Sequence, residues 1–284
     1  MIADFINEFT FSFEVFPPKK DDEFEDAFRI MKELADLKPD FISVTYGAGG
    51  SRTRNTIEIA SYIQNELKLP ALAHLTCVGS KKQDILDNVQ KMKDAGIVDI
   101  MALRGDRPAW MDDQQFNDRD FIYAQDLVRF LKKETPDLQL CGGCYPEKHF
   151  EAPNMEEDIA HLLEKQEAGC DYFISQLFFD NDLFYRFEDA AKMAGIHKPL
   201  IAGIMPITSA KQLGTTVSLS GSSVPKSLAD LIATYGDTPE DMRKAGIEYA
   251  ADQIRKLKEH GVDGIHIYSM NKPKVTREIC EALK

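Results

Sequence analysis

The sequence predicts an α/β protein folded as one (βα)8 barrel, a TIM barrel, over residues 1–284. Eight short apolar runs alternate along the chain with stretches of helical spacing. The length of 284 residues also suits such a barrel, which needs roughly 250 residues and tolerates insertions. We therefore expect a single catalytic domain with no second domain.

A repeated pattern defines the expected strands: a helical stretch, a Gly or Pro, often an Asp, and then a β-branched or aromatic run. Examples are MKELADLKPDFISVTYG and EKQEAGCDYFISQLFFD. The Gly is typical of a helix C-terminus, and the run is too apolar to have a solvent-exposed face, which indicates a parallel sheet. The expected strands are residues 11–16, 41–46, 71–77, 100–105, 138–145, 172–179, 200–206 and 264–270.

The segments between these runs show helical periodicity, for example Phe28, Met31, Leu34 and Leu37. An open doubly wound sheet is the main alternative, although such sheets normally use fewer strands. The strands exclude a helical repeat array. The Gly/Ser-rich stretch 214–227 is expected to be a loop over the active face.

Composition excludes several classes of protein. The net charge of −13 and the lack of a dense Lys/Arg cluster argue against a nucleic-acid partner. No apolar stretch is long enough to cross a bilayer, and the N-terminus lacks an export signal. Five cysteines without disulfide-rich spacing add to the expectation of a cytoplasmic protein. An anionic ligand would need local cations or backbone N–H groups.

Polar residues gather where the strands end. In FSFEVF, alternation separates Phe11, Phe13 and Val15 from Ser12, Glu14 and Phe16, so the carboxylate is directed to the face opposite the apolar one. Barrel enzymes carry their chemistry at the C-terminal ends of the strands. The residues at or just past these ends are Glu14, Thr45, His74, Arg104, Asp106, Tyr145 and Gln176.

Each of these residues also has a structural interpretation. Glu14 could be only the partner of Arg104 in the barrel lumen. His74 could be a core histidine bonded to backbone, and Gln176 could tie two strands together. Seven such residues at one end of a barrel are nevertheless hard to explain by packing alone.

The CGGC motif at 141–144 could be a redox dithiol or half of a zinc site. No second Cys or His pair stands at ligand spacing, and the motif ends a strand, so we interpret it as two packed thiols. A G-x-G-x-x-G motif does not follow the first strand, which excludes a Rossmann nucleotide site.

Together these motifs resemble the methylenetetrahydrofolate reductase family. The resemblance is carried, from about residue 11 to the C-terminus, by FSFEVFPPK, ISVTYGAGG, HLTC, LRGD, YPEKH, SQLFFD and GIMPI. The combination of the early E-V-F-P-P-K with L-R-G-D and Q-x-F-F-D is specific. The chain resembles the short bacterial form, without the C-terminal regulatory domain of eukaryotic members.

The resemblance implies a flavoprotein that makes 5-methyltetrahydrofolate for methionine synthesis, with FAD, NADH or NADPH, and 5,10-methylenetetrahydrofolate as its ligands. Glu14 matches the general acid, and its apolar setting would raise its pKa. Asp106 matches an acid near flavin and pterin, and Gln176 a residue that contacts folate and nicotinamide. A homo-oligomer is also expected. The positions that match FAD-binding residues are Thr45, His74, Arg104, Asp106, Tyr145, His149, Asp158 and Lys165.

Two positions depart from the family pattern. Ala210 stands in TSAKQL where bacterial members often have an aromatic residue, and Lys272 stands where an Arg is common. Lys272 is cationic and belongs to the expected substrate site, but it cannot hold a carboxylate with two parallel bonds.

Two alternatives to a reductase remain. A flavin-free lyase or aldolase would need a Schiff-base lysine, and none of the expected strands contains a Lys. A non-catalytic ligand-binding barrel would not need this set of polar residues.

Overall fold

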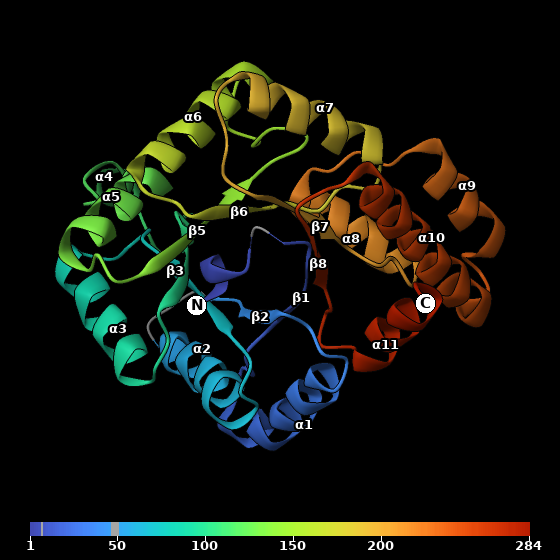
Figure 1. Cartoon of the computed structure of the whole chain (residues 1–284), viewed down its shortest axis with the longest axis horizontal. Helices are drawn as coiled ribbons and strands as arrows, with labels where there is room; N and C mark the ends of the chain where they lie inside the picture. Colours follow the sequence, from blue (N-terminus) through green and yellow to red (C-terminus); the bar gives the residue numbers. More distant parts are fainter. Residues whose placement is uncertain (7, 47–50) are drawn as a thin grey trace.

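The chain folds as a closed barrel of eight parallel strands in sequential order, with β8 paired to β1 (Figure 1). The computed structural model describes residues 1–6, 8–46 and 51–284. The predicted barrel is confirmed, and the open-sheet alternative is wrong. The strands are β1 (Thr10–Val15), β2 (Phe41–Val44), β3 (Ala71–Thr76), β4 (Asp99–Leu103), β5 (Gln139–Cys144), β6 (Tyr172–Ser175), β7 (Leu200–Ile204) and β8 (Gly264–Tyr268).

Helices form an outer ring around the strands (Figure 1). They are α1 (Phe24–Ala35), α2 (Ser51–Ser61), α3 (Lys82–Asp94), α4 (Asp113–Asn117), α5 (Ala124–Glu134), α6 (Met155–Ala168), α7 (Asn181–Met193), α8 (Ala210–Ser220), α9 (Lys226–Tyr235), α10 (Pro239–His260) and α11 (Pro273–Ala282). Three short turns complete the description: η1 (Ile2–Asp4), η2 (Asp21–Glu23) and the π-helical η3 (Tyr62–Glu66). None of the described helices has the length and apolar character needed to span a membrane.

The aspartates that precede several strands bind the backbone of the preceding strand. Asp40 Oδ2, just before β2, accepts the Phe11 N–H of β1 at 2.7 Å. Asp171 and Asp263 do the same for Leu140 of β5 and Leu200 of β7, each at 2.8 Å. These bonds satisfy backbone donors near the strand starts, which explains why Asp recurs in the sequence pattern.

The lower barrel lumen is an apolar core closed by the N-terminal segment. Ile2 and Ile6 pack there against side chains such as Phe41, Met101 and Tyr172. The Ile2 N–H donates to Asp99 Oδ1 at 2.9 Å, and Figure 1 shows η1 in the barrel centre. Because this end is filled, any site in the barrel has to lie at the opposite, C-terminal end of the strands.

The predicted loop over residues 214–227 is largely wrong. Residues 214–220 belong to α8, residues 226–227 begin α9, and only 221–225 connect the two helices. Ser209 Oγ accepts the Gln212 N–H at 3.2 Å and caps α8. Gly221, with φ +72°, ends the helix. Many residues between these two caps are weak helix formers, so the composition of the stretch indicated a loop and not a helix.

Two glycines provide a matched test of this helical layer. In α10, a Cβ at Gly246 would lie 1.7 Å from the Ile207 carbonyl oxygen, whereas a Cβ at Gly214 in α8 meets nothing within 4 Å. We expect Gly246→Ala to lower the free energy of unfolding by about 1–3 kcal/mol through overpacking. Gly214→Ala should raise it by up to about 1 kcal/mol through helix propensity.

Chemical denaturation of both variants checks this prediction. A destabilising effect of Gly214→Ala would contradict the helical assignment of residues 214–220. An unchanged stability of Gly246→Ala would contradict the close contact between α10 and the segment that follows β7.

Candidate active site at the C-terminal end of the barrel

Glu14 lies in the upper lumen, on the inner face of β1. Its Cα is paired with Ser43 of β2 and Tyr268 of β8, and its side chain is 12% exposed. Phe13 and Val15 are buried in the layer between strands and helices. The alternation predicted from the sequence is therefore observed: β1 presents apolar side chains to the helices and the carboxyl group to the lumen.

Burial determines the charge state of Glu14. Desolvation raises its pKa to about 8, and it lowers the pKa of the neighbouring His74 to about 4. His74 Nε2 lies 3.6 Å from Glu14 Oε2 and has no hydrogen-bond partner among the described residues. The two groups thus form a neutral contact near pH 7, in which Glu14 keeps its proton. The backbone bond considered for His74 is not found at Nε2.

A second buried histidine, which sequence reasoning missed, lies below Glu14. His266 of β8 contacts Ser12 Oγ through Nδ1 at 2.7 Å and Ser43 Oγ through Nε2 at 3.1 Å. Burial lowers its pKa to about 3, so the imidazole is neutral. The sequence could have predicted this residue, because strand alternation places Ser12, Ser43 and His266 all on the inner face.

Tyr268, also missed, extends across the lumen at the level of Glu14. Its hydroxyl donates to the Ser175 carbonyl oxygen at 2.6 Å. This arrangement requires Gly203 on β7, because a Cβ there would lie 2.8 Å from the Tyr268 hydroxyl and 2.3 Å from the Ser175 oxygen. Together with His266, Tyr268 gives the site a fixed polar floor.

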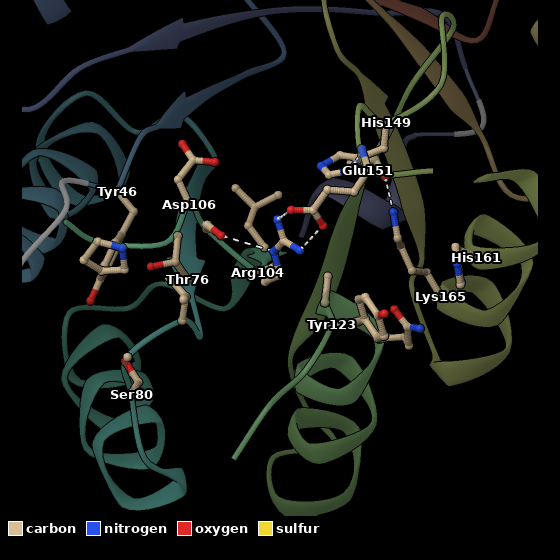
Figure 2. Close-up of a pocket in the computed structure, with 18 of the residues that line it drawn as sticks. Tyr46, Thr76, Ser80, Arg104, Asp106, Tyr123, His149, Glu151, His161 and Lys165 are labelled. Atoms are coloured by element: carbon tan, nitrogen blue, oxygen red, sulfur yellow. Dashed lines mark hydrogen bonds and ion pairs between the residues drawn. The ribbon is translucent and has the colours of Figure 1, made fainter. Parts of the chain in front are cut away.

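A cavity of about 870 Å³ opens beside this floor. It is lined by the ends of β3, β4 and β5 and by residues of α3, α5 and α6 (Figure 2). Six predicted cofactor-binding residues line it: Arg104, Asp106, Tyr145, His149, Asp158 and Lys165. The structure therefore brings together, in one concave site, residues that are up to 61 positions apart in the chain.

Two cations of the cavity differ in their pairing. Arg104 is held in a two-pronged contact by Glu151, with Arg104 Nη2 2.9 Å from Glu151 Oε1 (Figure 2). It does not pair with Glu14, so the structural interpretation of these two residues as an ion pair is wrong. Lys165 Nζ donates to the Gly143 carbonyl oxygen at 2.7 Å. Within the described residues no carboxylate forms an ion pair with Lys165, so its charge is available to a ligand.

The remaining wall of the cavity is built around Asp158. Burial raises the pKa of Asp158, which also accepts a hydrogen bond from the His149 backbone N–H. The His149 ring lies edge-on to Tyr145, with 4.9 Å between centroids. Glu151, Tyr46, Trp110 and Tyr123 also line the cavity and were not predicted. Tyr46 ends the expected strand 41–46, in which alternation selects Thr45, and the other three lie on connecting segments or at a helix start, where strand alternation gives no signal.

The cavity fits a dinucleotide such as FAD. Its volume is near the upper end of the usual 300–1,000 Å³ range for ligand pockets. Lys165 supplies positive charge for a phosphate on an otherwise acidic protein, whereas the charge of Arg104 is shared with Glu151. The aromatic residues Tyr145 and Tyr46 supply apolar surface for rings.

Other predicted residues lie outside the cavity lining. Glu14 and His74 are in the adjoining lumen, and Thr45 directly precedes the lining residue Tyr46. Gln176 Oε1 accepts the Leu177 N–H at 2.9 Å, so the amide is folded onto its own backbone. Among the described residues, no hydrogen bond or ion pair joins these four side chains to the six that line the cavity.

The two positions that depart from the family pattern lie at the starts of α8 and α11. Lys272 is exposed immediately before α11, and Ala210 is the first residue of α8. Neither lines the cavity. The GAGG part of the second family motif, residues 47–50, lies outside the described residues.

The interpretation of CGGC as two packed thiols is confirmed. Cys141 and Cys144 are free and buried, and burial raises the pKa of both thiols. No cluster of metal-binding side chains occurs in the part of the chain that the structure describes.

Comparisons with known proteins agree with this architecture. The protein-family model described as methylenetetrahydrofolate reductase matches residues 2–284. The 5,10-methylenetetrahydrofolate reductase of Pectobacterium carotovorum is 33% identical over 282 residues, which cover 99% of this chain and 92% of the relative. Methylenetetrahydrofolate reductase (NADH) 1 of Arabidopsis thaliana is 33% identical over 271 residues, covering 92% of this chain. This chain spans about half of the plant protein, since the match covers 46% of it.

Among solved structures, a Clostridium thermocellum protein that binds two copies of 5-methyl-5,6,7,8-tetrahydrofolic acid has the same fold. It aligns with a TM-score of 0.70 at 17% identity, and the alignment covers 99% of this chain and 98% of that chain. At this identity the likeness concerns the fold alone. The family model and the bacterial relative, each covering nearly the whole sequence, lead to the conclusion that this chain belongs to the methylenetetrahydrofolate reductase family.

Proposed function

We propose that this protein reduces 5,10-methylenetetrahydrofolate to 5-methyltetrahydrofolate, with electrons that pass from a reduced nicotinamide through FAD. The observation that carries the proposal is a buried carboxyl group, Glu14, which forms no ion pair with a Lys or Arg among the described residues and lies in the lumen at the same end of the barrel as a cavity of dinucleotide size. Family membership and the names of the bacterial and plant relatives support the substrate. The name of the Arabidopsis relative favours NADH as the donor.

In this proposal Glu14 is the general acid. Opening the methylene bridge of the folate needs a proton on the pterin side, so that an electrophilic iminium forms. Glu14 holds a proton near neutral pH because its burial penalises the carboxylate. The neutral His74 beside it neither removes this proton nor stabilises the charged form.

The cavity residues would hold FAD, which once reduced by the nicotinamide would supply a hydride for the methylene carbon. Lys165 and Arg104 would meet its phosphates, while His149, Tyr145 and Asp158 would position its sugar and ring system. Thr45 and His74 would contact it from the lumen side. Asp106 lines the cavity and is exposed, so it can place negative charge near both flavin and pterin, which would favour the iminium.

The folate and the nicotinamide would use the space between Glu14 and the cavity. Gln176 would reach them after its amide is released from the Leu177 N–H, and Lys272 would bind the folate carboxylates as a single charge. Supply of methyl groups for methionine synthesis, a cytoplasmic location and a homo-oligomeric assembly remain predictions.

Purified protein gives the first test. A yellow protein with a flavin spectrum that oxidises NADH in the presence of methylenetetrahydrofolate supports the proposal. A colourless protein that cannot be reconstituted with FAD would instead favour a flavin-free lyase or a non-catalytic barrel.

The substitution Glu14→Gln tests the role of the acid. It keeps the shape of the side chain but removes the transferable proton. We expect FAD to stay bound, flavin reduction by NADH to be nearly normal, and reoxidation by methylenetetrahydrofolate to slow by roughly 100-fold or more. Stopped-flow absorbance measures each half-reaction separately. An equal loss in both half-reactions, or loss of FAD, would mean that Glu14 is structural.

The protonation of Glu14 can also be tested without any ligand. Its folded-state pKa of about 8 exceeds the ordinary value of 4.5, so the folded protein binds one more proton than the unfolded chain between these values. Stability contributed by the neutral group is therefore lost as the pH rises from about 5 to about 8. Glu14→Gln lacks this titration.

We expect the free energy of unfolding of Glu14→Gln, relative to the wild type, to increase over this range by about 1.4 kcal/mol per pH unit at most. Urea denaturation at pH 5, 6.5 and 8 measures the difference. His74 is present in both proteins, so its own titration largely cancels. A difference that does not change with pH would show that Glu14 ionises normally.

A further inference from the structure

Trp110 is the only tryptophan of the chain and lies at the edge of the cavity. It follows β4 in the segment before α4 and is 66% exposed. Exposed tryptophans are uncommon, because the ring is large and apolar. Its ring extends across to the segment between β3 and α3, where a Cβ on Gly79 would lie 3.4 Å from two of its ring atoms.

The segment around Trp110 is held firmly although the ring is exposed. Arg107 donates two hydrogen bonds to the Met111 carbonyl oxygen, at 3.0 and 2.8 Å, and pairs with Asp113 at 2.7 Å. Asp112 caps α4 by accepting the Gln115 N–H at 2.7 Å. Phe116 lies between the guanidinium groups of Arg107 and Arg119. The fold thus fixes the backbone on both sides of an exposed tryptophan that lines the cavity.

The chemistry of the cavity changes toward this end. Of the phosphate-binding cations of the proposed function, Arg104 directly follows β4 and Lys165 lies on α6. Near α3 the lining instead includes Asp84, Asp87, Asn88 and Lys91. The carboxylate and amide oxygens of the first three are acceptors that suit an uncharged ring with an amino group better than a phosphate, and Lys91 is the only cation among the four.

We propose that Trp110 is a stacking platform for the adenine base of the bound dinucleotide. The inference rests on the proposed function, because it concerns the far end of the same FAD. The flavin ring must lie near Glu14 to react, and therefore the adenosine half extends away from the barrel axis toward α3 and Trp110. An aromatic ring held at the cavity edge then covers the base on one face.

A comparison of FAD with FMN tests this assignment, since FMN lacks the adenosine half. Flavin-stripped full-length protein is titrated with each flavin, in the wild type and in Trp110→Ala, Trp110→Phe and Tyr235→Ala. Tyr235, at the end of α9, is a matched exposed aromatic residue that does not line the cavity.

We expect Trp110→Ala to weaken FAD binding by about 5- to 150-fold, the range for the loss of one base stack, and to leave FMN binding unchanged. Trp110→Phe should retain most of the FAD affinity, and Tyr235→Ala all of it. All tryptophan fluorescence of the protein comes from Trp110. ADP, which contains the adenosine half of FAD but no flavin, should therefore quench this fluorescence saturably, and energy transfer to a flavin cannot account for the quenching.

Three results would overturn the inference. They are an equal loss of FAD and FMN affinity in Trp110→Ala, no loss of either, and wild-type protein that binds FMN as tightly as FAD. In all three cases flavin binding and the proposed reaction could still stand. Wild-type protein that binds neither flavin would contradict the proposed function as well as the inference.

Discussion

The burial of one carboxyl group without a cation governs the candidate site. A charged carboxylate in a lumen of this kind would cost several kcal/mol, and no arginine or lysine of the described residues pairs with Glu14 to offset that cost. The protonated, neutral form of Glu14 therefore has the lower free energy. His74 and His266 are neutral for the same reason. The lumen therefore stores a proton at a pH where an exposed glutamate would have lost it.

Charge is instead concentrated a short way along the same end of the barrel. Arg104 is fixed by Glu151, and Lys165 is anchored to a backbone carbonyl, so both cations are positioned before any ligand arrives. This local arrangement allows a protein with a net charge of −13 to present positive charge to an anion. Under the proposed function, acid chemistry in the lumen and anion binding in the cavity would operate at the same end of the barrel.

The fold and part of the site could be predicted because strand alternation is a strong local signal. It placed Glu14 in the lumen, and the strand ends led to Arg104 and Tyr145 in the cavity. Alternation says nothing about loops, so Glu151 and Trp110 were missed. The α8 helix was missed because its sequence is rich in weak helix formers and its stability depends on its caps and packing. The orientation of the Gln176 amide depends on its own backbone, which no pattern reveals.

The aspartates before β2, β6 and β8 have a meaning for how such a barrel can change over time. Each one binds the backbone of the strand before it, so this bond between neighbouring strands is contained within a single βαβ segment. A segment of this kind contains both partners of its own Asp–backbone hydrogen bond. Duplication or exchange of one βαβ segment would keep this bond intact. Loops at the C-terminal ends of the strands could then diverge without disturbing the pairing of neighbouring strands.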